Sequence, residues 1–163
     1  MNKELLLLRH GKSDWGMDTD DFDRPLNNRG KRNAQQIGEW LEEHNLTPDL
    51  IISSPAIRAL TTAEIVCEAI GLPVQSIQTE KNIYEAGLSD LRQVLLDIPD
   101  SITRLLLVGH NPGFEYLLSY LAPNIPDDEK RMSTATLAYL KLDSQWSFLQ
   151  DGHLILRAKD LKQ

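Results

Sequence analysis

The fold class of this 163-residue chain is decided by one stretch, Leu5-Leu6-Leu7-Leu8-Arg9-His10-Gly11. A continuous apolar run of this length is typical of a strand that is buried on both faces of a parallel sheet. A second run, residues 105–108, is equally apolar and ends in Gly109-His110-Asn111. The sequence therefore predicts two buried strands, each of which is followed by a histidine in a turn that contains glycine.

Helical patterns separate the predicted strands. Apolar residues recur at three- and four-residue steps over residues 30–43 and 55–70, and Ser54-Pro55 is typical of a helix start. Shorter helices are predicted over 88–96 and 113–121, and a surface loop is predicted over 123–133. Further strands are predicted over 50–52, 74–77, 136–142, 146–150 and 154–158, and Gly152 is predicted to form the hairpin turn between the last two. Strands that alternate with helices predict an α/β fold, a three-layer, mostly parallel, doubly wound sheet with helices on both faces.

The composition is that of an ordinary globular protein, with 41% hydrophobic and 25% charged residues. The length predicts a single domain over residues 1–163. A net charge of −7 argues against nucleic-acid or membrane partners, because such binding needs basic stripes. The single cysteine, Cys67, excludes an internal disulfide and is predicted to be a buried thiol. The N-terminal apolar run is too short for a signal peptide or a membrane span, so we expect a cytoplasmic location.

Unusual polar residues follow the predicted strands, at the end of a parallel sheet where ligands bind. They are Arg9, His10, Ser53, Ser54, Arg58, Tyr84, Glu85, His110 and Asn111. Two arginines beside two histidines predict an anion pocket, because guanidinium forks match phosphate oxygens. The N–H groups of the helix start after Ser54 are expected to contribute to this pocket. We expect no metal, since no acidic or sulfur ligand has suitable spacing and the arginines would repel a dication.

Several of these segments resemble the motifs of one family. Leu8-Arg9-His10-Gly11-Lys12-Ser13 resembles the Arg-His-Gly signature of the histidine phosphatase superfamily, to which the phosphoglycerate mutases belong. Residues 53–63 and 108–113 resemble its second and third motifs. Asp23-Arg24-Pro25-Leu26 with Arg29-Gly30 resembles the small SixA-type branch of phosphohistidine phosphatases. The resemblance covers most of the chain and implies a phosphoglycerate mutase-like fold.

The resemblance also implies roles for the site residues. His10 is expected to be the nucleophile that attacks phosphorus and carries the phosphoryl group. Arg9, Arg58 and His110 are expected to hold the phosphate oxygens, and the supporting substrate contacts are expected to come from Ser13 and Asn111. For attack, one nitrogen of His10 must keep a free lone pair, so the other is expected to donate to a backbone carbonyl near Gly11.

The proton donor for the leaving group is less evident. Relatives with a His-Asp pair in the third motif use the aspartate as the acid, whereas this chain has Asn111. Glu85 is the candidate acid, and the alternative is that Glu85 is a surface residue at the start of a loop. Only about twenty residues separate Glu85 from the strand at 105–108, too few for a large lid.

The resemblance implies a phosphatase that needs no metal or cofactor, and the missing acid and lid favour phosphohistidine in proteins as its substrate. A phosphohistidine imidazole can leave as a neutral molecule once it is protonated, and an uncovered site suits a phosphoryl group on a protein surface. Two alternatives stay open. One is a phosphomonoesterase that acts on small phosphorylated metabolites. The other is a non-catalytic phosphate-binding module, against which the two histidines argue, because binding alone needs only the arginines.

Overall fold

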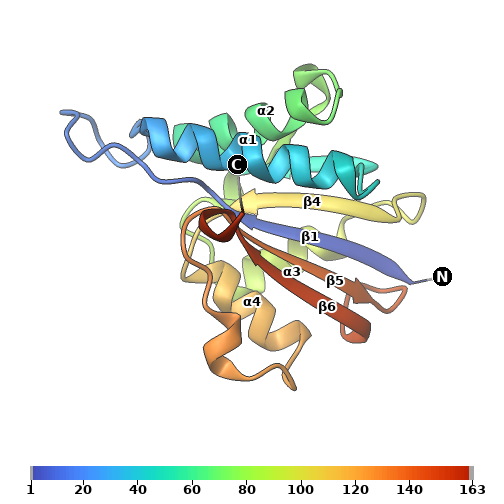
Figure 1. Cartoon of the computed structure of the whole chain (residues 1–163). Helices are drawn as coiled ribbons and strands as arrows, with labels where there is room; N and C mark the ends of the chain where they lie inside the picture. The colour runs from blue at the N-terminus through green and yellow to red at the C-terminus, as the bar shows by residue number, and fades with distance from the viewer. Residues whose placement is uncertain (1, 162–163) are drawn as a thin grey trace.

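The centre of the molecule is one six-stranded sheet, seen in a computed structural model that describes residues 2–161 (Figure 1). The strands are β1 (Lys3–Arg9), β2 (Leu50–Ser53), β3 (Gln78–Thr79), β4 (Arg104–Gly109), β5 (Thr136–Leu142) and β6 (Leu149–Arg157). Their order is β3-β2-β4-β1-β5-β6. Strands β3, β2, β4 and β1 are parallel, whereas β5 is antiparallel to β1 and β6 to β5. The predicted mostly parallel sheet is confirmed.

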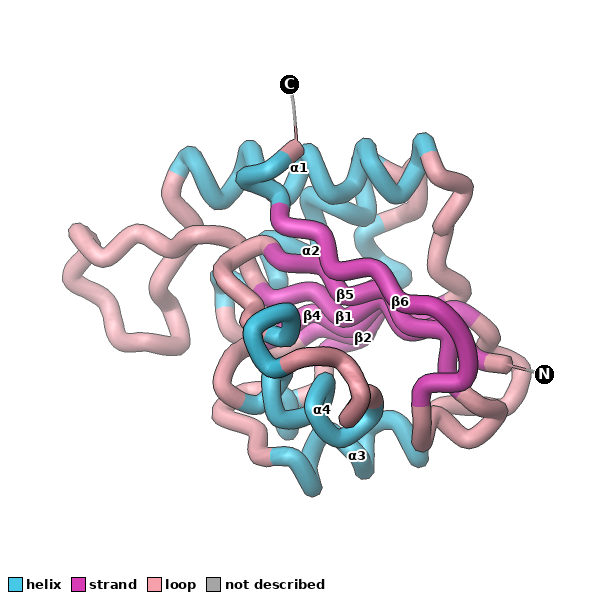
Figure 2. The backbone as a smooth tube through the Cα atoms, turned by 60° about the horizontal axis from the view of Figure 1, so that its bottom comes forward, coloured by secondary structure: helices cyan, strands magenta, loops and turns pink. Residues whose placement is uncertain are grey.

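Helices cover both faces of the sheet. Helices α1 (Asn28–Glu43) and α2 (Ile57–Ala69) lie on one face, and α3 (Leu88–Leu96) and α4 (Gly113–Leu121) lie on the other (Figures 1 and 2). The part of the chain that the structure describes also contains the short 3-10 turns η1 (Val74–Ser76), η2 (Lys81–Ile83), η3 (Asp127–Lys130) and η4 (Ala158–Asp160). Within residues 2–161, every helix is too short or too polar to cross a bilayer. The predicted three-layer α/β architecture is confirmed.

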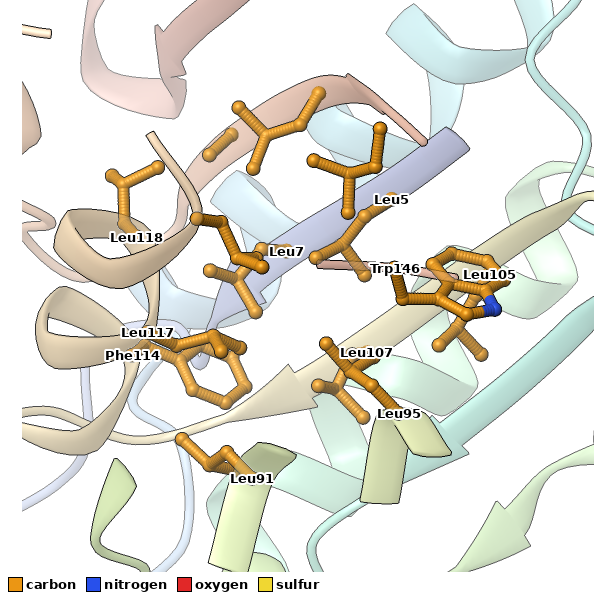
Figure 3. Close-up of a cluster of buried hydrophobic side chains, with 14 of the residues drawn as sticks. Leu5, Leu7, Leu91, Leu95, Leu105, Leu107, Phe114, Leu117, Leu118 and Trp146 are labelled. Atoms are coloured by element: carbon orange, nitrogen blue, oxygen red, sulfur yellow. The ribbon is translucent and has the colours of Figure 1, made fainter. Parts of the chain in front are cut away.

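The leucines of β1 alternate between the two helical layers. Leu5 and Leu7 pack with α3 and α4 in one buried cluster (Figure 3), while Leu6 and Leu8 pack with α1 and α2 in the other. The same alternation continues in β4, because parallel pairing places Leu105 beside Leu5. Both faces of these strands are covered at Leu5–Leu8 and at Leu105–Val108, so every position within these two runs is apolar.

The strand predicted at residues 74–77 is wrong. A 3-10 turn occupies this stretch, where the Ser76 N–H donates to the Pro73 carbonyl (3.0 Å) and the Ile77 N–H to the Val74 carbonyl (3.2 Å). The strand β3 starts only at Gln78 and is two residues long. The proline fixes its own φ near the value that a turn requires, and this outweighs the β propensity of Val74 and Ile77.

The hairpin predicted at Gly152 is also wrong. One continuous strand, β6, contains Gly152, and the turn lies before it, where the Asp143 N–H donates to the Phe148 carbonyl (2.9 Å). The Asp143 side chain accepts from two N–H groups within this turn, those of Gln145 and Ser147. An edge strand with mostly exposed residues carries little hydrophobic alternation, and a glycine inside it resembles a turn.

Cys67 is buried in α2, as predicted. Its thiol donates to the carbonyl groups of Leu72 and Pro73 at 3.3 and 3.4 Å. Burial raises the pKa of the Cys67 thiol, so the reactive thiolate is disfavoured.

Candidate active site

The register of the sheet brings the two predicted histidines together. Strands β1 and β4 pair in parallel with Arg9 beside Gly109, so the next residues, His10 and His110, leave the sheet at the same level. The His10 N–H donates to the Gly109 carbonyl (3.0 Å), and the two imidazole centroids lie 5.2 Å apart. Both rings are buried. The carboxyl ends of the central strands thus form the core of a site.

The hydrogen bond of His10 determines its tautomer. Nδ1 of His10 lies 2.7 Å from the carbonyl oxygen of Gly11, and since a carbonyl can only accept, Nδ1 carries the proton. This bond confirms the predicted contact with a carbonyl near Gly11, and it leaves the lone pair of Nε2 available. Burial, with smaller contributions from His110 and the nearby arginines, lowers the pKa of His10 to about 3. His10 is therefore a neutral imidazole at pH 7.

Gly11 is needed for close packing between two segments. A Cβ atom on Gly11 would lie 2.7 Å from the carbonyl oxygen of Gly30, and one on Gly30 would lie 2.2 Å from that of Lys12. The two glycines therefore let the chain after β1 pass directly against the start of α1. This contact fixes the backbone of the residue that follows His10.

A pocket of about 480 Å³ opens beside the two histidines. Its lining consists of Arg9, His10, Lys12, Ser13, Trp15, Arg24, Arg58, His110, Asn111, Ser133 and Thr134. Four of these residues are cationic, and none of the described lining residues is acidic. The chain as a whole has a net charge of −7, so the pocket is a local positive site on an acidic protein. Of the predicted site residues, six line this pocket, and Glu85 does not.

Asp21 organises two arginines of the pocket and was not identified from the sequence. Its carboxylate accepts from Arg24 (2.6 Å), from Arg58 (3.0 Å) and from the Tyr84 hydroxyl (2.6 Å), and its carbonyl accepts from Arg58 (2.6 Å). Hydrogen bonds from Tyr84 and the guanidinium groups hold the pKa of Asp21 well below its usual range. The only sequence signal was the proximity of Asp21 to the segment Asp23-Arg24-Pro25-Leu26.

Arg24 and Thr62 were also missed as site residues, although both lie in motifs that the sequence displays. Nε of Arg24 donates to the Ser13 hydroxyl (2.9 Å), which joins two lining residues. The Gly11 N–H donates to the Thr62 hydroxyl (3.0 Å), and that hydroxyl donates to the Arg58 carbonyl (2.7 Å). Thr62 therefore links the turn after His10 to the first turn of α2.

Four polar atoms around the pocket lack protein partners. In the described part of the chain, the buried side-chain nitrogen and oxygen atoms without a hydrogen bond are Nε of Arg9, Nε of Arg58, Nδ1 of His110 and Oδ1 of Asn111. Buried polar groups are nearly always paired, so such a cluster calls for an explanation. All four belong to lining residues, which is the arrangement expected where a polar ligand binds.

The start of α2 differs from the sequence expectation. The helix begins at Ile57, and its first N–H groups are already paired: Ala56 donates to the Ser54 hydroxyl (3.2 Å) and Ile57 to the Phe22 carbonyl (3.0 Å). The prediction that this helix start offers free N–H groups to an anion is therefore wrong for these two groups. Ser54 instead contacts His110, with Nε2 and Oγ 2.8 Å apart.

Two predicted site residues occupy unexpected positions. The Asn111 amide nitrogen already donates to the Met132 carbonyl (2.7 Å) and the Glu115 carboxylate (2.9 Å), so it ties α4 to the segment before β5. Its unpaired atom is an acceptor, which cannot bind an ionised phosphate oxygen. Glu85 is exposed, with a positive φ of 57°, outside the lining of the pocket.

Because the imidazoles of His10 and His110 are buried, we expect the free energy of unfolding to fall on acidification. Burial also lowers the pKa of His110 to about 4, whereas an unfolded chain takes up a proton on each ring near pH 6.5. Below about pH 6.5 the unfolded state therefore binds more protons, and the free energy of unfolding falls as pH falls towards 4. Urea titrations at pH 7.5, 6 and 5 should show this slope. The His10→Gln variant should have a smaller slope, and an unchanged slope in that variant would contradict burial of His10 as a cause.

Comparisons with known proteins agree with this geometry. The sequence model of the histidine phosphatase superfamily, branch 1, matches residues 5–93. An uncharacterized protein of Mycobacterium tuberculosis (strain H37Rv) is 28% identical over 152 residues, which cover 89% of this chain and 93% of that protein.

Two solved structures share the fold over nearly their whole length. The protein histidine phosphatase SixA complexed with tungstate has a TM-score of 0.85 at 21% identity, over 98% of this chain and 99% of that chain. A candidate phosphohistidine phosphatase SixA from Agrobacterium tumefaciens has a TM-score of 0.78 at 29% identity, over 94% of this chain and 98% of that chain. The predicted small phosphoglycerate mutase-like fold is confirmed. Since the family model spans more than half of the sequence, including both His10 and Arg58, this chain belongs to the histidine phosphatase superfamily.

Proposed function

We propose that this chain is a metal-independent phosphatase that removes the phosphoryl group from phosphohistidine on a protein. One observation carries the proposal: a neutral His10 with a free Nε2 stands at a strongly cationic pocket whose described lining has no carboxylic acid. Such a site can hold and transfer a phosphoryl group, but it offers no acid to an alkoxide leaving group. The likeness to the Agrobacterium tumefaciens structure supports the same substrate class.

The proposed first step transfers the phosphoryl group to His10. The lone pair of Nε2 attacks phosphorus, and the bond from phosphorus to the substrate imidazole breaks as the new nitrogen–phosphorus bond forms. The departing imidazole takes the bonding electron pair and leaves as a neutral molecule when its other nitrogen already carries a proton. In the second step, water attacks phosphorus and the Nε2–phosphorus bond breaks, which releases phosphate and restores the neutral His10.

The unpaired donors of the pocket would hold the transferring group. Nε of Arg9 and Nε of Arg58 each have one free N–H. If Ser54 donates its hydroxyl proton to Nε2 of His110, the neutral ring keeps its proton on Nδ1, which is the unpaired atom. These three donors would stabilise the charge of the phosphoryl oxygens in the transition state.

A substrate panel tests the proposal. The purified protein should hydrolyse phosphohistidine on a protein with a kcat/KM at least about tenfold above that for sugar phosphates, a difference of about 1.4 kcal/mol. Higher activity on the sugar phosphates would favour the small-metabolite phosphomonoesterase. Absence of turnover with tight phosphate binding would favour the binding module.

The same substrate panel, repeated in the presence of EDTA, tests whether turnover requires a bound metal ion. Within residues 2–161, no group of three or more His, Cys, Asp or Glu side chains is placed to hold a metal ion. We expect EDTA to leave turnover unchanged. Strong inhibition that zinc reverses would contradict the metal-independent mechanism.

Glu85→Gln tests whether the exposed Glu85 carboxylate acts as the leaving-group acid. Because Glu85 lies outside the pocket lining, we expect less than about a threefold loss on phosphohistidine, an aryl phosphate and an alkyl phosphate alike. An acid that the leaving group needs contributes typically about 10²–10⁴-fold. A loss of that size confined to the alkyl phosphate would show that Glu85 reaches the leaving group after all.

A further inference from the structure

The segment from Asp14 to Pro25 forms an arm at the mouth of the pocket. The blue chain at the left of Figure 1 projects beyond the carboxyl ends of the strands and returns to α1. An isolated antiparallel bridge between Ser13 and Leu26 closes its base, where the Asp14 N–H donates to the Pro25 carbonyl (2.8 Å). We call residues 14–25 the arm.

The arm exposes two large apolar side chains, one of which lines the pocket. Trp15 is 75% exposed, more than any other large hydrophobic residue in the described chain, and Met17 is 52% exposed. Trp15 also lines the pocket, and the Arg24 guanidinium lies 3.6 Å from the centroid of its ring. Stacking on a pocket arginine, rather than burial, therefore holds this tryptophan in place. An exposed tryptophan of this kind is a typical anchor of a protein interface.

Asp21 and Phe22, in the C-terminal half of the arm, attach it to the body of the molecule. The carbonyl of Phe22 accepts from the Ile57 N–H (3.0 Å), and the Phe22 ring meets the Tyr84 ring edge-on at 5.2 Å between centroids. Asp21 adds the contacts with Arg58 and Arg24 described above. An arm with both ends fixed loses less conformational entropy when a partner binds.

The charge of the arm indicates the kind of partner. Its acidic residues are Asp14, Asp18, Asp20, Asp21 and Asp23. Asp21 pairs with arginines of the pocket, and three of the others are exposed. An acidic arm beside a cationic pocket repels small free anions, while it attracts a surface that carries lysine or arginine around its phosphoryl group. A charge arrangement of this kind favours a basic protein surface over a small phosphorylated metabolite.

We propose that the arm docks the protein substrate, with Trp15 and Met17 against an apolar patch beside the phosphohistidine and the aspartates against flanking lysine or arginine residues. This inference rests on the proposed phosphohistidine phosphatase activity and adds how the partner is selected. The arm contributes binding to the protein part of the substrate, and the pocket contributes binding to the phosphoryl group.

The test compares two substrates that share the same phosphoryl group. They are free phosphohistidine and a lysine-rich histone phosphorylated on histidine with phosphoramidate. Met17→Ala should lower kcat/KM at least about threefold on the histone and leave turnover of free phosphohistidine unchanged. Trp15→Ala combined with Met17→Ala should lower kcat/KM at least about tenfold more on the histone than on free phosphohistidine. Asp18→Asn with Asp20→Asn should weaken the salt dependence of histone turnover, because fewer charges then attract the substrate.

Matched controls separate the docking arm from a general effect on the surface. Phe148 lies outside the arm and is 51% exposed, close to the 52% of Met17. Phe148→Ala should not change turnover of either substrate. Equal losses on both substrates in the arm variants would overturn docking by the arm while leaving the proposed function intact. Failure of the wild-type protein to hydrolyse either substrate would overturn the proposed function itself.

Discussion

Replacement of His10 by alanine should abolish formation of a phosphoenzyme and lower turnover at least about a thousandfold, about 4 kcal/mol in the activation barrier. The wild-type protein, mixed with a labelled phosphohistidine substrate and quenched, should retain label that disappears in acid and survives alkali. This lability is characteristic of a nitrogen–phosphorus bond. The reason lies in the tautomer: Nδ1 of His10 is committed to the Gly11 carbonyl, so Nε2 is the nitrogen free to form that bond.

The control for this experiment is His153→Ala. His153 is an exposed histidine on β6, so its replacement removes an imidazole without touching the pocket. The control variant should take up label as the wild type does. Label that persists in His10→Ala, or label that resists acid, would remove His10 from the role of nucleophile.

The meeting of the two histidines could be predicted from the sequence because it depends on backbone regularity. Two continuous apolar runs predict two buried strands, and parallel strands present their carboxyl ends at one edge of the sheet. The sequence therefore places Arg9, His10 and His110 at the same edge of the sheet, and the strand order β4-β1 is the structural fact that makes them neighbours. A nucleophilic imidazole needs one nitrogen fixed as a donor, and this requirement predicts a carbonyl partner for His10, which the structure identifies as that of Gly11.

The missed features depend on contacts between segments without periodic patterns. Asp21 lies in an irregular loop, and its three side-chain hydrogen bonds reach Arg24, Arg58 and Tyr84, the last two of which are distant in sequence. Nothing in the sequence around an aspartate in an acidic loop indicates which distant side chains it contacts. The pairing of an N–H group at the start of α2 was missed for a similar reason, because the Phe22 carbonyl that accepts from the Ile57 N–H comes from the same loop.

Arg58→Lys should lower turnover at least about tenfold, about 1.4 kcal/mol in the barrier, although it keeps the positive charge. In the structure both Nη atoms of Arg58 bind Asp21, while Nε is buried and unpaired among the lining residues. One guanidinium thus holds the loop and still offers an N–H to the pocket. A lysine ammonium is a single point donor and cannot reach both in this geometry, so either the loop contact or the phosphate contact is lost.

The effect should appear in kcat more than in KM, because phosphoryl transfer places its largest demand on charge stabilisation in the transition state. Vanadate, which mimics five-coordinate phosphorus, should inhibit the wild type competitively and bind Arg58→Lys more weakly by a similar factor. Arg92→Lys is the matched control, since Arg92 is exposed on α3 and lies outside the pocket, and its turnover and vanadate affinity should equal those of the wild type. If Arg58→Lys kept full turnover with normal vanadate binding, charge alone would suffice at this position, and the planar fork of the guanidinium would have no part in the chemistry.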